Sequence, residues 1–360
     1  MYYSNIRPKI TSDRTLIILH VIAILLHILS GIFGIYNIQE GNPRVDVIAP
    51  LFEYLEDPGV DESFFMPKPK AIFSVPILTP MVCVEFITAG FHIIYLLAIL
   101  YPGVDRFIRD WIINSPSKNP LRWIEYGITA TIMSSFENLG LGMQDFYFFI
   151  RNVSCGIALQ GLGYLLEWVG DEYKKSKGGR DEKSRVFLIK LYRGLYYFQG
   201  LLNNLPFVGI VLYQTFGSET RGAFRLFLEN CIPLGFWFNT FGVICQMNFY
   251  GWRQFAGKEF TEKWYILLSL STKMAIFWTS FATFKKIIED NGNVALSGLD
   301  WNVIRYCALS VPAIVVGCFA WLDYWSWEPM MVYEDGSDYK GKSKKNYTGE
   351  LRLLPTISEN

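Results

Sequence analysis

Eight apolar runs follow one another along this chain of 360 residues, and they constrain its fold more than any other feature. A helix needs about 20 apolar residues to cross a bilayer. Helices are favoured there because lipid offers the backbone no hydrogen-bond partners, so its N–H and C=O groups must bond within the helix. Of all residues, 51% are hydrophobic and only 18% are charged. The pattern predicts an all-α, multi-pass transmembrane bundle, with runs at about 14–36, 72–101, 121–141, 143–169, 188–215, 224–249, 264–286 and 303–325.

Basic side chains gather in alternate loops. They lie before the first run, after the second, fourth and sixth runs, and in the C-terminal tail, whereas the loop at 37–71 is rich in Asp and Glu. Because loops rich in Lys and Arg stay on the cytoplasmic side, we expect a cytoplasmic N-terminus. The predicted parts are a cytoplasmic segment at 1–13, a seven-helix core at 14–290 with an extracellular loop at 37–71, an additional transmembrane helix at 291–326 and a disordered cytoplasmic tail at 327–360.

A lysine stands near the middle of the seventh run. Lys273 falls inside the apolar segment Tyr265–Phe284, and a charge at the bilayer centre costs roughly 2.5 to 3.5 kcal/mol. We therefore expect this amine to be paired, deprotonated or covalently modified. Since lysine amines form Schiff bases with carbonyl compounds, Lys273 is the first candidate for holding a bound group.

Two polar residues could serve this lysine. Glu125 lies near the start of the third run, where its carboxylate could balance a buried cation at Lys273; the alternative is an interfacial glutamate paired with Arg122. Ser269 precedes Lys273 by four residues and shares its helix face. Its hydroxyl could hydrogen-bond the amine or its counter-ion, or else a backbone carbonyl of its own helix.

The first two runs carry buried titratable residues. His27 and His92 lie deep in these runs, and Glu85 precedes His92 by seven residues on the same face. Imidazole can relay protons because it titrates near neutral pH, so these three residues are a candidate proton relay. The alternative is that they are hydrogen-bonded core residues.

Several function classes are not supported. The net charge is zero, so no nucleic-acid partner is expected. The six cysteines all lie in apolar runs without CxxC spacing, which favours packing over disulfides or metal binding. No catalytic triad, metal-ligand cluster or phosphate-binding glycine loop is evident, and we do not expect an enzyme.

The motifs of the third and seventh runs resemble those of the heliorhodopsins. The resemblance rests on Arg122–Tyr126 followed by Thr131–Met133, and on Glu262–Lys273 followed by Trp278. Leu26-His27 and Phe91-His92 are similar to the buried histidines of that family. The resemblance covers about 14–290 and implies a seven-helix rhodopsin-like core with a cytoplasmic N-terminus, to which this chain adds an eighth span.

The resemblance implies a photoreceptor that binds all-trans retinal covalently. It also implies a homodimer in the lipid bilayer, in a plasma membrane or, if the chain is viral, a host cell membrane, and a cytoplasmic protein partner of unknown identity. The expected site residues are Lys273 for the Schiff base, Glu125 as counter-ion, Ser269 and Thr272 for tuning, Met133, Trp278 and Phe236 for the retinal pocket, and His27, His92 and Glu85 for the polar cavity.

The chain departs from the family pattern in ways that leave its function open. Ser271-Thr272 replaces a small apolar pair before the lysine, and Glu85 adds a carboxylate to the second run. Both changes are in the direction that proton transport needs, as in the viral branch associated with proton conduction. The alternatives to a signalling photoreceptor are a light-activated proton channel or transporter using Glu85, Glu125, His27 and His92, and a retinal-free transporter or scaffold in which Lys273 pairs with a carboxylate.

Overall fold

The structure is a computed structural model. It describes residues 14–39, 41–42, 44–55, 64–101, 118–140, 144–176, 182–217, 239–252, 255, 258–290 and 301–325. Two of the predicted parts, the N-terminal segment 1–13 and the C-terminal tail 327–360, lie outside these residues.

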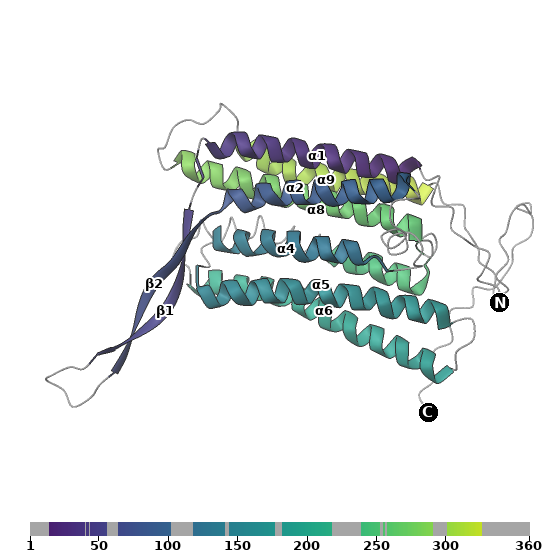
Figure 1. Ribbon diagram of the computed structural model, residues 1–360, viewed down its shortest axis with the longest axis horizontal. Helices are drawn as coiled ribbons and strands as arrows, with labels where there is room; N and C mark the ends of the chain where they lie inside the picture. The colour runs from purple at the N-terminus through teal and green to yellow at the C-terminus, as the bar shows by residue number, and fades with distance from the viewer. Residues whose placement is uncertain are drawn as a thin grey trace, which may run out of the picture.

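Long helices lie side by side in one bundle, and the predicted all-α architecture is confirmed (Figure 1). Helix α1 packs against α2 and α8, α2 against α4, α4 against α5, α5 against α6, and α8 against α9. Residues 239–250 are also helical. The bounds are α1 Arg14–Gln39, α2 Leu78–Leu100, α4 Pro120–Gly140, α5 Phe146–Ser176, α6 Glu182–Gly217, α8 Lys258–Asp290 and α9 Trp301–Trp325.

Within the described residues, three helices combine the length and the apolar composition of a membrane span: α1, α2 and Phe260–Lys286 within α8. Helix α1 shows what such a helix presents to lipid. Its outer face carries Leu25 and Leu29, which are 55% and 61% exposed, while its inner face buries His20 and His27. A helix with an apolar outer face and polar buried residues fits a bilayer better than water.

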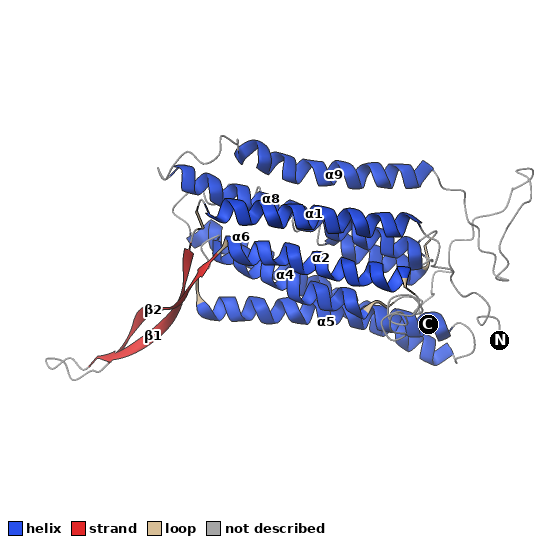
Figure 2. Cartoon of the chain, turned by 45° about the horizontal axis from the view of Figure 1, so that its top comes forward, coloured by secondary structure: helices blue, strands red, loops and turns tan. Residues whose placement is uncertain are grey.

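A two-stranded hairpin projects from one end of the bundle (Figures 1 and 2). Strands β1 (Arg44–Leu55) and β2 (Phe64–Pro76) are antiparallel, with Arg44 opposite Pro76 and Leu55 opposite Phe64. We call this end the hairpin side, and the end where α1 begins the N-terminal side. The segment expected as an extracellular loop at 37–71 therefore contains the end of α1 and most of a hairpin whose register shifts between Val47 and Ile48. The second helix begins at Leu78, not near 72.

The described core on the hairpin side is apolar. Aliphatic and aromatic side chains from α2, α4 and α8 form one buried cluster there. Helix α1 comes close to it at Gly34, where a Cβ atom would lie 2.5 Å from Val82 Cγ2 and 3.1 Å from Phe277 Cζ, so a side chain there would collide with α2. The cluster consists of Ile77, Leu78, Met81, Val82, Val84, Met133, Ile276, Phe277, Phe281, Ala282 and Phe284.

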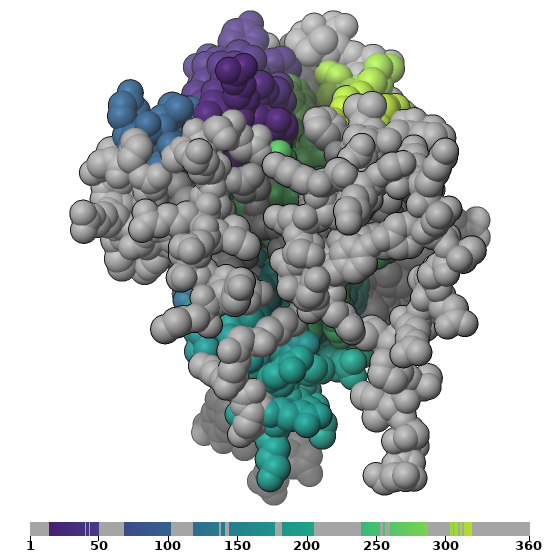
Figure 3. Space-filling model, turned by 90° about the vertical axis from the view of Figure 1, so that its right-hand side faces the viewer, coloured from purple at the N-terminus to yellow at the C-terminus, as the bar shows by residue number. Residues whose placement is uncertain are grey.

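The additional helix predicted within 291–326 is α9. It packs along α8, with Ile304 against the apolar cluster and Val316 against a second cluster that includes Tyr265. Its outer face exposes Val311 and Ile314. Seen from the N-terminal side, the end of α1 (purple) lies between the ends of α2 (blue) and α9 (yellow), and α5 and α6 (teal) lie at the opposite edge (Figure 3). Because α9 covers one side of α8, most of the lysine-bearing helix is buried.

Candidate functional site

Lys273 lies in the middle of α8 and is paired. Its ammonium group donates to the carboxylate of Glu125 on α4 and, at 3.0 Å, to the hydroxyl of Thr88 on α2. The side chains of Lys273 and Glu125 are only 6% and 3% exposed. The ring of Tyr126 lies 5.3 Å from the amine, within the range of a cation–π contact. Three helices thus hold one buried charge pair at the centre of the bundle.

The contacts of Arg122 decide between the two partners considered for Glu125, which are Lys273 and Arg122 itself. Arg122 lies three residues before Glu125 on α4, but its guanidinium pairs with Glu167 on α5 and Glu262 on α8. The interfacial pairing of Arg122 with Glu125, which the sequence left possible, is therefore not the arrangement in the structure. Glu125 is instead directed to Lys273.

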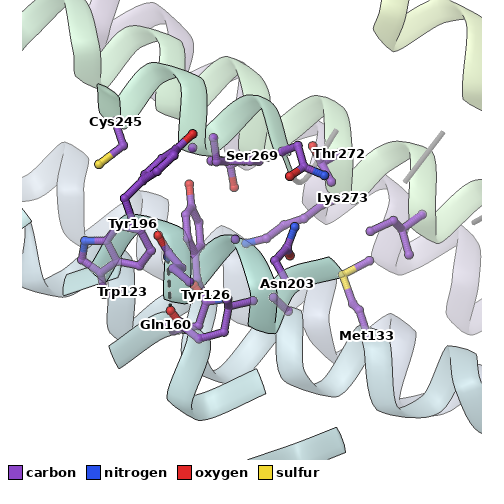
Figure 4. A pocket seen from close by; sticks show the side chains of 18 residues that line it. Trp123, Tyr126, Met133, Gln160, Tyr196, Asn203, Cys245, Ser269, Thr272 and Lys273 are labelled. Carbon is purple, nitrogen blue, oxygen red and sulfur yellow. Dashed lines mark hydrogen bonds between the residues drawn. The ribbon is translucent and has the colours of Figure 1, made fainter. Parts of the chain in front are cut away.

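A pocket adjoins Lys273 between α4, α5, α6, residues 239–250 and α8. Lys273 reaches into it from α8, toward Tyr126 on the facing helix (Figure 4). The empty space, including its open mouth, is about 910 Å³. The walls are aromatic and aliphatic with a few amides, and they include Trp123, Tyr126, Met133, Gln160, Tyr196, Gln199, Asn203, Asn239, Phe241, Ser269, Thr272 and Ile276.

The structure describes four of the residues that were predicted to lie around Lys273. Ser269, Thr272 and Met133 line the pocket. Trp278 does not: its ring packs on Phe33 at 4.8 Å between ring centroids, and its indole nitrogen donates to Ser30, both on α1. Phe236 lies outside the described residues.

The residues predicted as a proton relay lie together between α1 and α2. His27 Nδ1 is 2.7 Å from Glu85 Oε2, and both side chains are fully buried. His20 Nδ1 is 2.9 Å from His92 Nδ1. The rings of His27 and His92 are stacked with centroids 5.9 Å apart, so the four side chains form a row from the middle of the bundle toward the N-terminal side.

Thr88 is the site residue that the sequence did not bring forward. It lies three residues after Glu85 and four before His92, so all three share one face of α2. Its hydroxyl contacts Lys273, which places the row next to the central charge pair. The signal was the helical spacing of polar residues in an apolar run.

The lining of the pocket has the features that retinal, the group implied by the sequence motifs, would need. A primary amine opens into an apolar cavity, as the attachment of a polyene aldehyde requires. In the lining of the same pocket, Thr272 Oγ1 is buried without a hydrogen-bond partner among the described residues. An unsatisfied buried hydroxyl in the pocket wall is a position where a polar atom of a bound group can be hydrogen-bonded. The residues present fit retinal.

Comparison with known families agrees with this geometry. Residues 16–284 match the sequence model of the heliorhodopsin family. The chain belongs to the heliorhodopsin family. This heliorhodopsin is therefore a helical membrane protein of a retinal-based, light-sensing family. No match was found among curated proteins. The matched region ends before α9, so α9 lies beyond the matched core of this heliorhodopsin.

Proposed function

We propose that this heliorhodopsin absorbs light through all-trans retinal bound covalently to Lys273 as a protonated Schiff base. The observation that supports this most is the buried amine of Lys273, which opens into an apolar pocket and is paired with Glu125. Here the free ammonium group stands in for the protonated imine, which carries the same charge. A buried cation needs a partner, and Glu125 is the counter-ion in this proposal.

The neighbouring side chains hold and tune the charge. Thr88 accepts a hydrogen bond from the Lys273 nitrogen, and Ser269 and Thr272 place hydroxyls on the same stretch of α8. Met133 and the aromatic residues of the pocket exclude water from a polyene. Bound retinal supplies visible absorption and a light-driven change of shape. The protein has to convert that change into movement of its helices.

The output in this proposal is a change of conformation that a protein partner reads, and not a reaction on a substrate. The N-terminal side, which the charge pattern assigns to the cytoplasm, holds the buried ends of the polar network. We propose that an unidentified cytoplasmic protein binds there and that the protein acts as a homodimer in the bilayer. Helix α8 spans from the pocket to both ends of the bundle, so movement at Lys273 can reach either side.

The test is a visible absorption band in membranes from cells supplied with all-trans retinal. We expect a band that hydroxylamine removes under illumination, because hydroxylamine cleaves an imine by forming an oxime. Membranes that contain the folded protein and retinal but show no visible band would overturn the proposal. That result would favour the retinal-free transporter or scaffold, in which Lys273 only pairs with Glu125.

The row of titratable side chains supports a second candidate, a light-activated proton channel or transporter. Glu85, His27, His92 and His20 provide closely spaced groups from the centre of the bundle to the N-terminal side. Toward the hairpin side, the apolar cluster around Phe277 and Phe281 closes the interface. Within the part of the chain that the structure describes, the polar path therefore reaches the N-terminal side, and transport would require the apolar cluster to open.

Glu85→Gln separates the two candidates. If the protein conducts protons, we expect this variant to lose its light-evoked current under voltage clamp with a pH gradient, because glutamine cannot bind and release a proton at that point of the row. The visible band should remain, since the pair of Lys273 with Glu125 is intact. Glu172→Gln, a change outside the row, is the control and should keep the current.

Two other results have a clear meaning. A current in Glu85→Gln as large as in the wild type would remove Glu85 from the path. Absence of current from the wild-type protein, with its visible band present, would leave the signalling photoreceptor as the function.

A further inference from the structure

A second buried cluster of charges lies on the N-terminal side of the Lys273 site. Arg122 on α4 donates through Nη2 to Glu167 Oε1 and, at 2.9 Å, through Nη1 to Glu262 Oε2. The side chains of Arg122, Glu167 and Glu262 are 4%, 5% and 14% exposed. The guanidinium also lies 3.7 Å above the ring of Tyr265. One cation is thus held by two carboxylates and an aromatic face.

Asn119 ties the two carboxylates together. Its backbone N–H donates to Glu167 Oε2 at 2.9 Å, and its side-chain amide donates to Glu262 Oε2 at 3.2 Å. Both oxygens of Glu167 therefore accept hydrogen bonds. The contacts of Glu262 among the described residues all fall on Oε2.

The charges in this cluster do not balance if every group is ionised. Among the described residues that contact one another here, two carboxylates and one guanidinium give a net charge of −1. The neighbouring acidic residues Asp171 and Glu172 are matched by two lysines that contact them, Lys118 and Lys175. Those lysine side chains are 28% and 48% exposed and pair with Asp171 and Glu172, so they add little to the charge balance at Arg122.

An uncompensated buried charge is expensive. Two carboxylates that share one site avoid that cost when one of them keeps its proton, because like charges at close range disfavour ionisation of both. With one proton bound, Arg122 is balanced by one carboxylate and the cluster is neutral.

We propose that Arg122, Glu167 and Glu262 form a proton-binding site, in which the two glutamates hold one proton between them. The ligand of this site is a proton, and the site is separate from the pair of Lys273 with Glu125. Among the described residues, its other titratable neighbours include Tyr95, Tyr126, Tyr265 and Cys245 in addition to Lys118, Asp171, Glu172 and Lys175.

The site connects two parts of the polar network. The hydroxyl of Tyr95 donates to Asn119 Oδ1 at 3.5 Å, and the Tyr95 ring stacks on His20 with centroids 5.2 Å apart. On α4, Arg122 is one helical turn from Glu125, a rise of about 4.5 Å. The site therefore lies where the histidine row and the counter-ion helix meet. Its role in a light response rests on the proposed function, but its proton does not require the chromophore.

Infrared spectroscopy of the dark, retinal-supplied protein tests the site directly. The C=O stretch of a protonated carboxyl group is separate from the bands of carboxylates and moves to lower frequency in D2O. We expect the spectrum of the wild type minus that of Glu262→Gln to contain one such band, and the same for Glu167→Gln, because the remaining glutamate then ionises beside Arg122. The double variant, with both Glu167→Gln and Glu262→Gln, should also lose one band and no more.

The control is Glu172→Gln on the same helix as Glu167, which should leave the protonated-carboxyl region unchanged. If neither variant loses a band relative to the wild type, both glutamates are ionised in the wild type. That result would overturn the proposal. Loss of two bands in the double variant would overturn it as well, since each glutamate would then hold its own proton.

Two further measurements keep the test decisive. If a glutamine variant does not fold, Glu167→Asp and Glu262→Asp retain a carboxyl group and should shift the band without removing it; an unshifted band in both would overturn the site. The visible band is recorded on the same samples. Its absence with the infrared band present would reject retinal binding while the proton site stands, so the two proposals can fail separately.

Discussion

Lys273→Ala abolishes the visible absorption band of the retinal-supplied protein, because alanine cannot form the imine that holds the chromophore. The expected loss is complete, and added retinal should absorb only like the free aldehyde. Absorption spectra of purified wild-type and variant protein, normalised to protein concentration, measure it. Removing Lys273 also leaves Glu125 as a buried carboxylate without its cation, so thermal unfolding is measured on the same samples to show that the variant folds.

A second buried lysine on the same helix provides the control. The amine of Lys285 donates to the backbone carbonyls of Asn37 and, at 3.1 Å, of Gly41, and it is not among the residues that line the pocket. Lys285→Met removes this amine at similar side-chain volume and should keep the visible band. A band that survives in Lys273→Ala but is lost in Lys285→Met would place the attachment point at Lys285 and contradict the proposed site.

Glu125→Gln shifts the visible band to longer wavelength by an amount that is easily seen in a simple spectrum. A carboxylate beside the imine stabilises the positive charge near the nitrogen in the ground state. Without it, the charge spreads along the polyene and the excitation energy falls. The variant should also unfold more easily, since a buried cation without its partner costs roughly 3–5 kcal/mol.

The measurement is the absorption maximum of Glu125→Gln beside those of the wild type and Glu85→Gln. Glu85 is the matched control, because it is a fully buried carboxylate of the same region that pairs with His27. An unchanged maximum in Glu125→Gln would exclude Glu125 as the counter-ion. A larger shift in Glu85→Gln than in Glu125→Gln would transfer that role to Glu85.

Helical periodicity and hydropathy were enough to predict the bundle and to single out Lys273 as a candidate. The apolar runs mark the helices because a bilayer admits few other backbone structures. Lys273 was singled out because a charge in such a run needs a reason to be there. The spacing of seven residues between Glu85 and His92 predicted a shared face, and the structure shows this face turned toward His27 and His20.

The hairpin was missed for a local reason. Strands β1 and β2 contain Pro50, Pro67 and Pro69, and proline normally argues against a strand. In a ribbon of two strands, however, every strand is an edge, and a proline can face away from its partner without removing a ladder hydrogen bond. Hydropathy alone does not reveal how two strands pair. Residues 37–71 were therefore predicted as a loop, and residues 72–76 as the start of the second apolar run.

The order of residues in the chain determines which segments form helices and how far along the membrane normal each polar residue lies. It can do so because rise and periodicity are properties of a single helix. Which residues touch across helices depends on how each helix is rotated and packed against its neighbours. That packing directs Arg122 to Glu167 and Glu262, leaves Glu125 to Lys273, and turns Trp278 toward α1 and away from the pocket. No pattern within one helix contains this information, since the partners come from helices far apart in the chain.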